Sequence, residues 1–197
     1  MGPNTFLHGA LPLQPLVNED LYSLIVCSKV LKHLGGFPFA NHLHSASVQA
    51  EYLSTQSCAR ELWKDDREVN AQFSNKVNSY AKLLCDGSWQ ESDQRNLCYR
   101  VTKASEDLSR FINRLQRNPD EVSFNTPDQT TVNQTITTLP AIQCRMDNFL
   151  AGALCPVEFD IYKIPHTETE SAQQSCMRIN GFTHSARPRC WFAPSLK

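Results

Sequence analysis

The sequence has little glycine and no surplus of positive charge. Its 197 residues include 7 glycines, half of the ~14 that an average content of about 7% would give. Loops around catalytic groups often need glycine, because it adopts backbone conformations that other residues avoid. The formal net charge is −1, whereas general nucleic-acid-binding domains usually carry a basic excess. We therefore expect no nucleic-acid partner, and the glycine shortage weighs mildly against a loop-built active site.

Long apolar runs and known catalytic motifs are also missing. A membrane-spanning helix needs roughly 20 apolar residues, and the most apolar region, 21–34, is interrupted by serine, lysine and histidine. The chain contains no G-x-S-x-G turn, phosphate-binding loop, dinucleotide fingerprint or H-E-x-x-H motif. The sequence thus predicts no membrane span, no cofactor and no catalytic residue, and it favours a binding protein over an enzyme.

Cysteine, in contrast, is abundant and spread along the whole chain. No two cysteines form the C-x-x-C pair of a zinc knuckle or thiol-exchange motif. An even set at wide spacing is typical of a disulfide framework made in an oxidising compartment. We expect a secreted, extracellular or periplasmic protein; the alternative is a cytosolic protein with buried free thiols. The disulfide candidates are Cys27, Cys58, Cys85, Cys98, Cys144, Cys155, Cys176 and Cys190.

The strongest periodic signal lies in residues 66–118, which predict two consecutive antiparallel helices separated near Asp86-Gly87. Apolar side chains at steps of three and four share one helical face. Those of the first helix are Val69, Phe73, Val77, Tyr80 and Leu84. Those of the second are Leu97, Val101, Ala104, Leu108, Phe111 and Leu115. A disulfide needs Cα atoms within about 7 Å, so Cys85 can reach Cys98 only if the second helix starts near Asp93.

Two further helices are expected before this pair. The first has Asn18 as its N-cap and ends at Gly35-Gly36. Its inward residues are Leu21, Leu24, Ile25, Cys27, Leu31 and Leu34. The next covers about 45–64, with Val48, Tyr52, Ala59, Leu62 and Trp63 inward. Together the four predict an antiparallel bundle.

The C-terminal third is expected to be mixed. A helix over 141–154 would bury Ile142, Met146, Phe149, Leu150 and Ala153. Alternating residues at 157–162 predict a strand, and Asn180-Gly181 predicts a hairpin turn. The predicted fold is therefore mainly α, a bundle of about four helices with a small mixed α/β segment that carries a short β-hairpin and is stapled on by disulfides. The predicted divisions are an extended arm (1–17), the bundle (18–118), a polar connector (119–139) and the mixed segment (140–197). The connector holds Asn133, a candidate glycosylation site in an Asn-Gln-Thr sequon.

The best candidate binding patch lies in the tail, residues 176–197, which has no acidic residue. Arginine and tryptophan are enriched at the energetic centres of protein interfaces. We therefore predict that Arg187, Arg189, Trp191 and Phe192 bind a protein or another macromolecule, either as a site for an anionic partner or as an interface hot spot. The alternative is that Trp191 and Phe192 close the core and the arginines are solvated.

A secreted hydrolase is the rival interpretation, with its site between the bundle and the C-terminal segment. Its candidate residues are His42, His44, Glu158, Asp160 and His166. The His42 and His44 pair could bind a metal, but no acidic residue or cysteine lies near it in the sequence, so no metal site is predicted. A cytosolic helical adaptor with reduced cysteines is a third interpretation.

Overall fold

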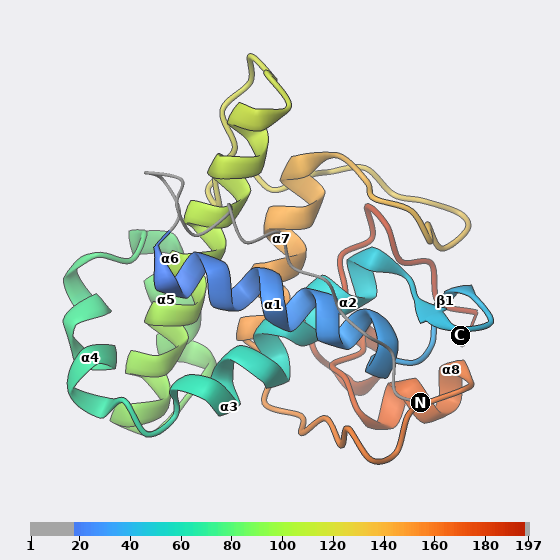
Figure 1. Ribbon diagram of the computed structural model, residues 1–197, viewed down its shortest axis with the longest axis horizontal. Coiled ribbons are helices and arrows are strands. Elements are labelled where there is room, and N and C mark those ends of the chain that lie inside the picture. The colour runs from blue at the N-terminus through green and yellow to red at the C-terminus, as the bar shows by residue number, and fades with distance from the viewer. Residues whose placement is uncertain (1–17, 196–197) are drawn as a thin grey trace.

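The computed structural model describes residues 18–195, which form a mainly helical protein (Figure 1). The helices are α1 (Glu19–Leu34), α2 (Ser47–Leu53), α3 (Ala59–Trp63), α4 (Arg67–Ala71), α5 (Ser79–Ser88), α6 (Ser92–Leu115), α7 (Ile142–Ala153) and α8 (Glu168–Gln173). A π-helical turn, η2 (Ser54–Cys58), and two 3₁₀ turns, η3 (Gln72–Asn75) and η4 (Arg178–Asn180), complete them. The extended arm expected for residues 1–17 lies outside the described residues.

The long helix α6 is where the sequence predicts it. Its inward residues from Leu97 to Phe111 are buried, but Leu115 is 67% exposed. The inward position predicted for Leu115 is wrong, because the end of α6 projects beyond the neighbouring helices (Figure 1). The helix begins at Ser92, so Cys85 and Cys98 can be bridged with their Cα atoms 5.9 Å apart.

The other helix of the predicted pair is not continuous. α4 passes into η3, and the helical path stops before α5. The side chain of Asn78 then accepts hydrogen bonds from Tyr80 N at 2.9 Å and Ala81 N at 3.3 Å. An asparagine in this position satisfies free N–H groups of a first turn, and it therefore starts a new helix. The inward position predicted for Val69 is wrong: Val69 is 42% exposed, because Asn70, 1% exposed, faces the interior instead. The other four apolar residues do pack against a buried cluster, but their spacing does not reveal a break between two helices that share a face.

The helix α7 lies at the centre of the protein. It contributes to all four buried apolar clusters, packs against α6 and α2, and runs beside α6 in Figure 1. The helix expected over 141–154 is therefore confirmed, with every inward residue buried. A four-helix bundle confined to 18–118 is not confirmed, because α7 supplies side chains to every part of the core.

The segment α2–η2–α3 forms one continuous helical path that agrees with the helix expected over 45–64. The wider π turn holds an extra residue, which rotates the residues that follow. Ala59 and Trp63 stay buried, whereas Leu62 is 56% exposed. The inward position predicted for Leu62 is therefore wrong. Against this path, Gly152 of α7 allows close contact, since a Cβ there would lie 2.2 Å from the carbonyl oxygen of Tyr52.

The strand and hairpin expected in the C-terminal segment are wrong. Its described residues, 154–195, contain no strand, and residues 157–162 form turns and loop. Gly181, at φ +84°, ends the 3₁₀ turn η4. A left-handed glycine suits the end of a helical turn as well as a hairpin. The two-stranded antiparallel sheet lies instead at β1 (Phe39–Asn41) and β2 (His44–Ser45).

The disulfide framework is confirmed, since no cysteine is free. The pairs are Cys27–Cys58, Cys85–Cys98, Cys144–Cys190 and Cys155–Cys176. The last two tie the C-terminal segment to α7 and to the residues just after it. Four disulfides indicate an oxidising, secreted or extracellular setting. Within residues 18–195, none of the helices combines the length and apolar character that a membrane crossing requires.

Candidate functional site

The tail is held in place by the polar connector that precedes α7. Val132 N donates to the carbonyl of Arg189 at 3.0 Å, and Ile136 N donates to the carbonyl of Trp191 at 2.8 Å. Thr135 Oγ1 also donates to the carbonyl of Ala193 and accepts from its N–H, both at 3.1 Å. The connector and the tail therefore run side by side as two fixed segments.

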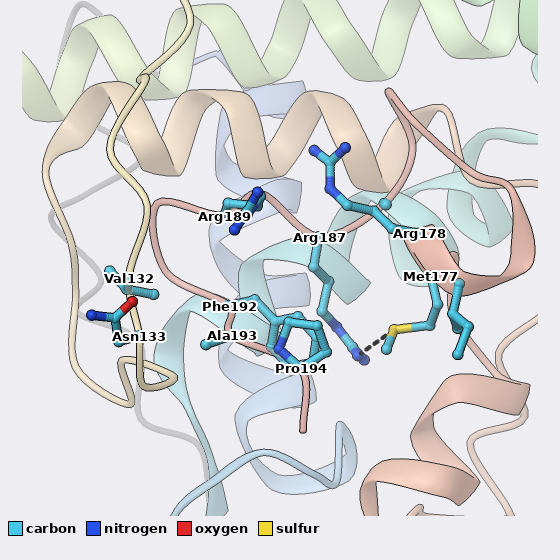
Figure 2. Close-up of a pocket in the computed structure, with 11 residues that line it drawn as sticks. Val132, Asn133, Met177, Arg178, Arg187, Arg189, Phe192, Ala193 and Pro194 are labelled. Atoms are coloured by element: carbon cyan, nitrogen blue, oxygen red, sulfur yellow. Dashed lines mark hydrogen bonds between the residues drawn. The ribbon is translucent and has the colours of Figure 1, made fainter. Parts of the chain in front are cut away.

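A cavity of about 410 Å³, here named the tail cavity, opens between these two segments (Figure 2). Among the described residues its lining contains three arginines and no acidic side chain. Much of the rest is apolar, and Asn133, the candidate glycosylation site, is exposed at its edge. The lining includes Met177, Arg178, Ile179, Arg187, Arg189 and Phe192.

The four tail residues singled out in the sequence have different environments. Trp191 is fully buried, and its Nε1 donates to Asn148 Oδ1 at 2.8 Å. Phe192 and Arg187 are 4% and 2% exposed, whereas Arg189 is exposed. The aromatic pair therefore closes the core, as the alternative interpretation expected. Arg187, Arg189 and Phe192 nevertheless come together around the tail cavity, whose described lining does not include Trp191. Trp191 packs against Phe192, with ring centroids 5.3 Å apart.

Arg187 has the most unusual environment of the three arginines. Its guanidinium lies 4.9 Å from the ring centre of Phe192 and 5.6 Å from that of Tyr52. Nη2 donates to Ser171 Oγ at 2.7 Å, and Nη1 contacts Met177 Sδ at 3.5 Å (Figure 2). Nε is buried and has no hydrogen-bond partner among the described residues. Burial lowers the pKa of Arg187 to about 10, so it stays charged at neutral pH.

A second cavity of about 320 Å³ adjoins the first and shares Arg178, Ala186 and Arg189 with it. Its lining includes Asp147 and His184. The Asp147 carboxylate accepts hydrogen bonds from Asp128 N at 2.7 Å and Gln143 Nε2 at 2.8 Å. Burial is the largest influence on this group and raises the pKa of Asp147 to about 6. The sequence placed Asp147 on no inward face, so this partly buried acid could not be found from helical periodicity.

Replacing Asp147 by Asn should make the protein more stable above pH 6 and flatten its stability between pH 4 and 6. The carboxyl group has a pKa of about 6 when folded, against an ordinary value near ~4. Folding is therefore favoured while the group is protonated, and this contribution is lost as pH rises through 6. The loss is on the order of 2 kcal/mol. Urea unfolding of the wild-type protein and of Asp147→Asn at pH 4, 5, 6 and 8 measures this difference in the free energy of unfolding.

The matched control for this experiment is Asp120→Asn, because Asp120 is exposed. We expect the control to shift stability by less than about 0.5 kcal/mol at every pH. An effect of Asp147→Asn that is the same at all four pH values would contradict the assignment.

The residues proposed for a hydrolase are not brought together by the contacts of the described chain. The His44 ring packs edge-on against His33, with centroids 4.8 Å apart. His166 stacks on Phe39 at 5.9 Å. Glu158 lines a separate cavity beside Gln56 and Arg60, and Asp160 pairs with Lys163 at 3.4 Å. His42 is exposed, and none of these contacts joins a histidine of the set to Glu158 or Asp160.

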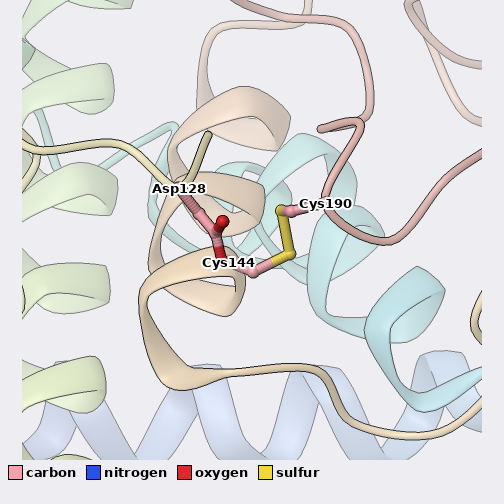
Figure 3. A group of neighbouring side chains, drawn as sticks. All are labelled: Asp128, Cys144 and Cys190. Carbon is pink, nitrogen blue, oxygen red and sulfur yellow. A yellow bond between two sulfur atoms is a disulfide. The ribbon is translucent and has the colours of Figure 1, made fainter. Parts of the chain in front are cut away.

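One group among the described residues has the spacing of metal ligands, namely Asp128, Cys144 and Cys190 (Figure 3). The three ligand atoms lie within 4.8 Å of one another. The two sulfurs are joined in a disulfide, whereas cysteine binds metals as a thiolate. The group therefore offers a metal a single carboxylate, and Oδ1 of that carboxylate accepts a hydrogen bond from Thr130 N at 2.8 Å.

No family model, curated protein or solved structure matches this chain.

Proposed function

We propose that this is an extracellular binding protein that recognises an anionic part of another macromolecule through the tail cavity. The observation that carries the proposal is the concentration of Arg178, Arg187 and Arg189 around one cavity whose described lining has no carboxylate. The chain as a whole has a formal net charge of −1, so this local positive charge is a feature of the cavity. Arginine is well suited to the task because its planar fork matches a carboxylate.

The accessible arginines are free to meet a partner. Arg178 and Arg189 are exposed, and neither takes part in the ion pairs found among residues 18–195. Exposed charges of this kind steer an oppositely charged partner and increase the association rate. The disulfide at Cys190 and the hydrogen bonds to the connector keep the site in shape, which reduces the entropy lost on binding. The sequon at Asn133 is open to glycosylation at the edge of this cavity.

The double variant Arg178→Gln/Arg189→Gln should bind an anionic polymer roughly tenfold more weakly than the wild-type protein. Fluorescent poly-L-glutamate is a suitable probe, with affinity measured by anisotropy at two salt concentrations. The physical reason is the loss of two unpaired charges beside the cavity, and the difference should shrink as salt screens them.

Arg114→Gln/Arg117→Gln is the matched control, since it removes the same charge at the projecting end of α6, where both side chains are exposed. We expect the control to bind within about twofold of the wild-type protein. Equal losses in the two double variants would mean that binding follows net charge alone, and the proposal would be abandoned. The proposal would also be abandoned if poly-L-glutamate did not bind the wild-type protein.

A further inference from the structure

We infer that Arg187 is a carboxylate-binding residue and that the tail cavity takes an apolar group bearing a single carboxylate. Its carboxylate would meet the Arg187 guanidinium, and its hydrocarbon part would lie against Met177, Ile179 and Phe192. The inference rests on the proposed function, because it specifies the chemistry that enters the cavity. Two sources share this chemistry: the C-terminal residue of a partner protein and a small free acid.

The fold leaves the charge of Arg187 incompletely compensated. A guanidinium has five N–H donors, and the hydrogen bonds within residues 18–195 engage one at Nη1 and one at Nη2. Nε has no partner there. Burying a charge is costly unless it is paired and hydrogen-bonded. The aromatic rings of Phe192 and Tyr52 compensate only part of this cost. An incoming carboxylate would therefore meet N–H groups of Arg187 that are already desolvated and have no other partner.

Tyr52 and Glu168 are titratable groups that act on the charge of Arg187. Tyr52 is neutral at ordinary pH, because burial raises its pKa, and its hydroxyl donates to the carbonyl of Ser185 at 2.8 Å. Glu168 attracts Arg187 and opposes the lowering of its pKa, while its carboxylate accepts hydrogen bonds from Ser195 N at 2.9 and 3.2 Å. The ion pairs within residues 18–195 do not include Arg187.

The surroundings of Arg187 favour a monocarboxylate over a phosphate. Phosphate sites usually gather several N–H donors, often at a helix N-terminus. The helix beside Arg187 is α8, and Glu168 in its first turn already offsets part of the Arg187 charge. The remaining charge suits a ligand with one negative charge better than a ligand with two. Beside Arg187, the described lining is apolar except for Asn133 and the exposed Arg178 and Arg189, and the volume of about 410 Å³ falls within the range of ligand pockets. One buried cation beside Met177, Ile179 and Phe192 fits one negative charge on an apolar body.

Calorimetric titration with sodium octanoate and with 1-octanol tests this directly, because the two ligands differ mainly in their charge. We expect octanoate to bind the wild-type protein about 30-fold more tightly than octanol, as a charge-assisted hydrogen bond predicts. Arg187→Met should remove that preference, while Arg114→Gln/Arg117→Gln, which removes the same kind of charge far from the cavity, should change octanoate affinity by less than about threefold. If Arg187→Met does not fold, Arg187→Lys is the second variant. It keeps the positive charge but lacks the planar N–H donors of a guanidinium, so it should still weaken octanoate binding.

Two acetylated tripeptides that end in leucine, one with a free carboxylate and one amidated, distinguish the sources. Tight binding of the free peptide and not of its amide supports a partner's C-terminus, and binding of octanoate alone supports a small acid. Equal binding of octanoate and octanol, or no binding of any carboxylate, overturns the inference. If poly-L-glutamate still requires Arg178 and Arg189 in that case, the proposed function stands without it; if poly-L-glutamate does not bind either, both fall.

Discussion

Replacing Glu51 by Gln will lower the free energy of unfolding by about 3–5 kcal/mol, although the two side chains have nearly the same size. Glu51 is 5% exposed and Arg145 is 7% exposed. Arg145 Nε donates to the two carboxylate oxygens of Glu51 at 3.0 and 3.2 Å, and Nη2 donates to Oε1 as well. The pair joins α2 to α7, so removing one member leaves an uncompensated charge in the centre of the protein.

A double-mutant cycle separates this cost from the net value of the pair. Arg145→Met removes the other charge, and the double variant should be more stable than Glu51→Gln alone because no buried charge is then left unpaired. Glu61→Gln is the control: its pair with Lys64 is solvent-exposed on both sides and should be worth less than about 1 kcal/mol. Urea unfolding of all four variants gives the comparison. Simple additivity of the two buried substitutions would contradict the expected coupling.

This pair also shows why the sequence predicts helices better than it predicts their arrangement. The helix over 141–154 follows from its apolar spacing, but its polar residues suggested an outer face. Arg145 and Asn148 are in fact buried, and their partners Glu51 and Val48 lie in α2. A partner 94 residues away leaves no mark on local periodicity. The central position of α7 therefore required the tertiary structure.

The candidate site was predictable in composition and not in shape. The absence of acidic residues in the tail pointed to Arg187, Arg189 and Phe192, which do line one cavity. The burial of Arg187 and Phe192 could not be inferred, because the disulfide from Cys190 to Cys144 and the hydrogen bonds to the connector fix the tail in place. The hairpin expected at Asn180-Gly181 failed for a local reason, since a left-handed glycine ends helical turns equally well.

Removal of the Cys144–Cys190 disulfide is expected to be almost as damaging as loss of Glu51, and it should also abolish ligand binding. Its sequence separation is 46 residues, for which the loss of loop-closure entropy corresponds to about 4 kcal/mol. The variant is Cys144→Ala/Cys190→Ala, compared by urea unfolding. Cys190 lies directly beside Arg189 and close to Phe192. Without the disulfide the tail would move, and these two residues would no longer be held in the lining of the cavity.

Cys85→Ala/Cys98→Ala provides the control that separates stability from binding. Its separation is 13 residues, so the same reasoning gives a loss of about 3 kcal/mol, but this disulfide joins α5 to α6, and neither cysteine lines the tail cavity. Under conditions where both variants remain folded, octanoate binding should survive without Cys85–Cys98 and disappear without Cys144–Cys190. Undiminished binding in the Cys144→Ala/Cys190→Ala variant would show that the tail keeps its shape without this disulfide. The connector's hydrogen bonds at Val132, Thr135 and Ile136 would then be what positions the arginines.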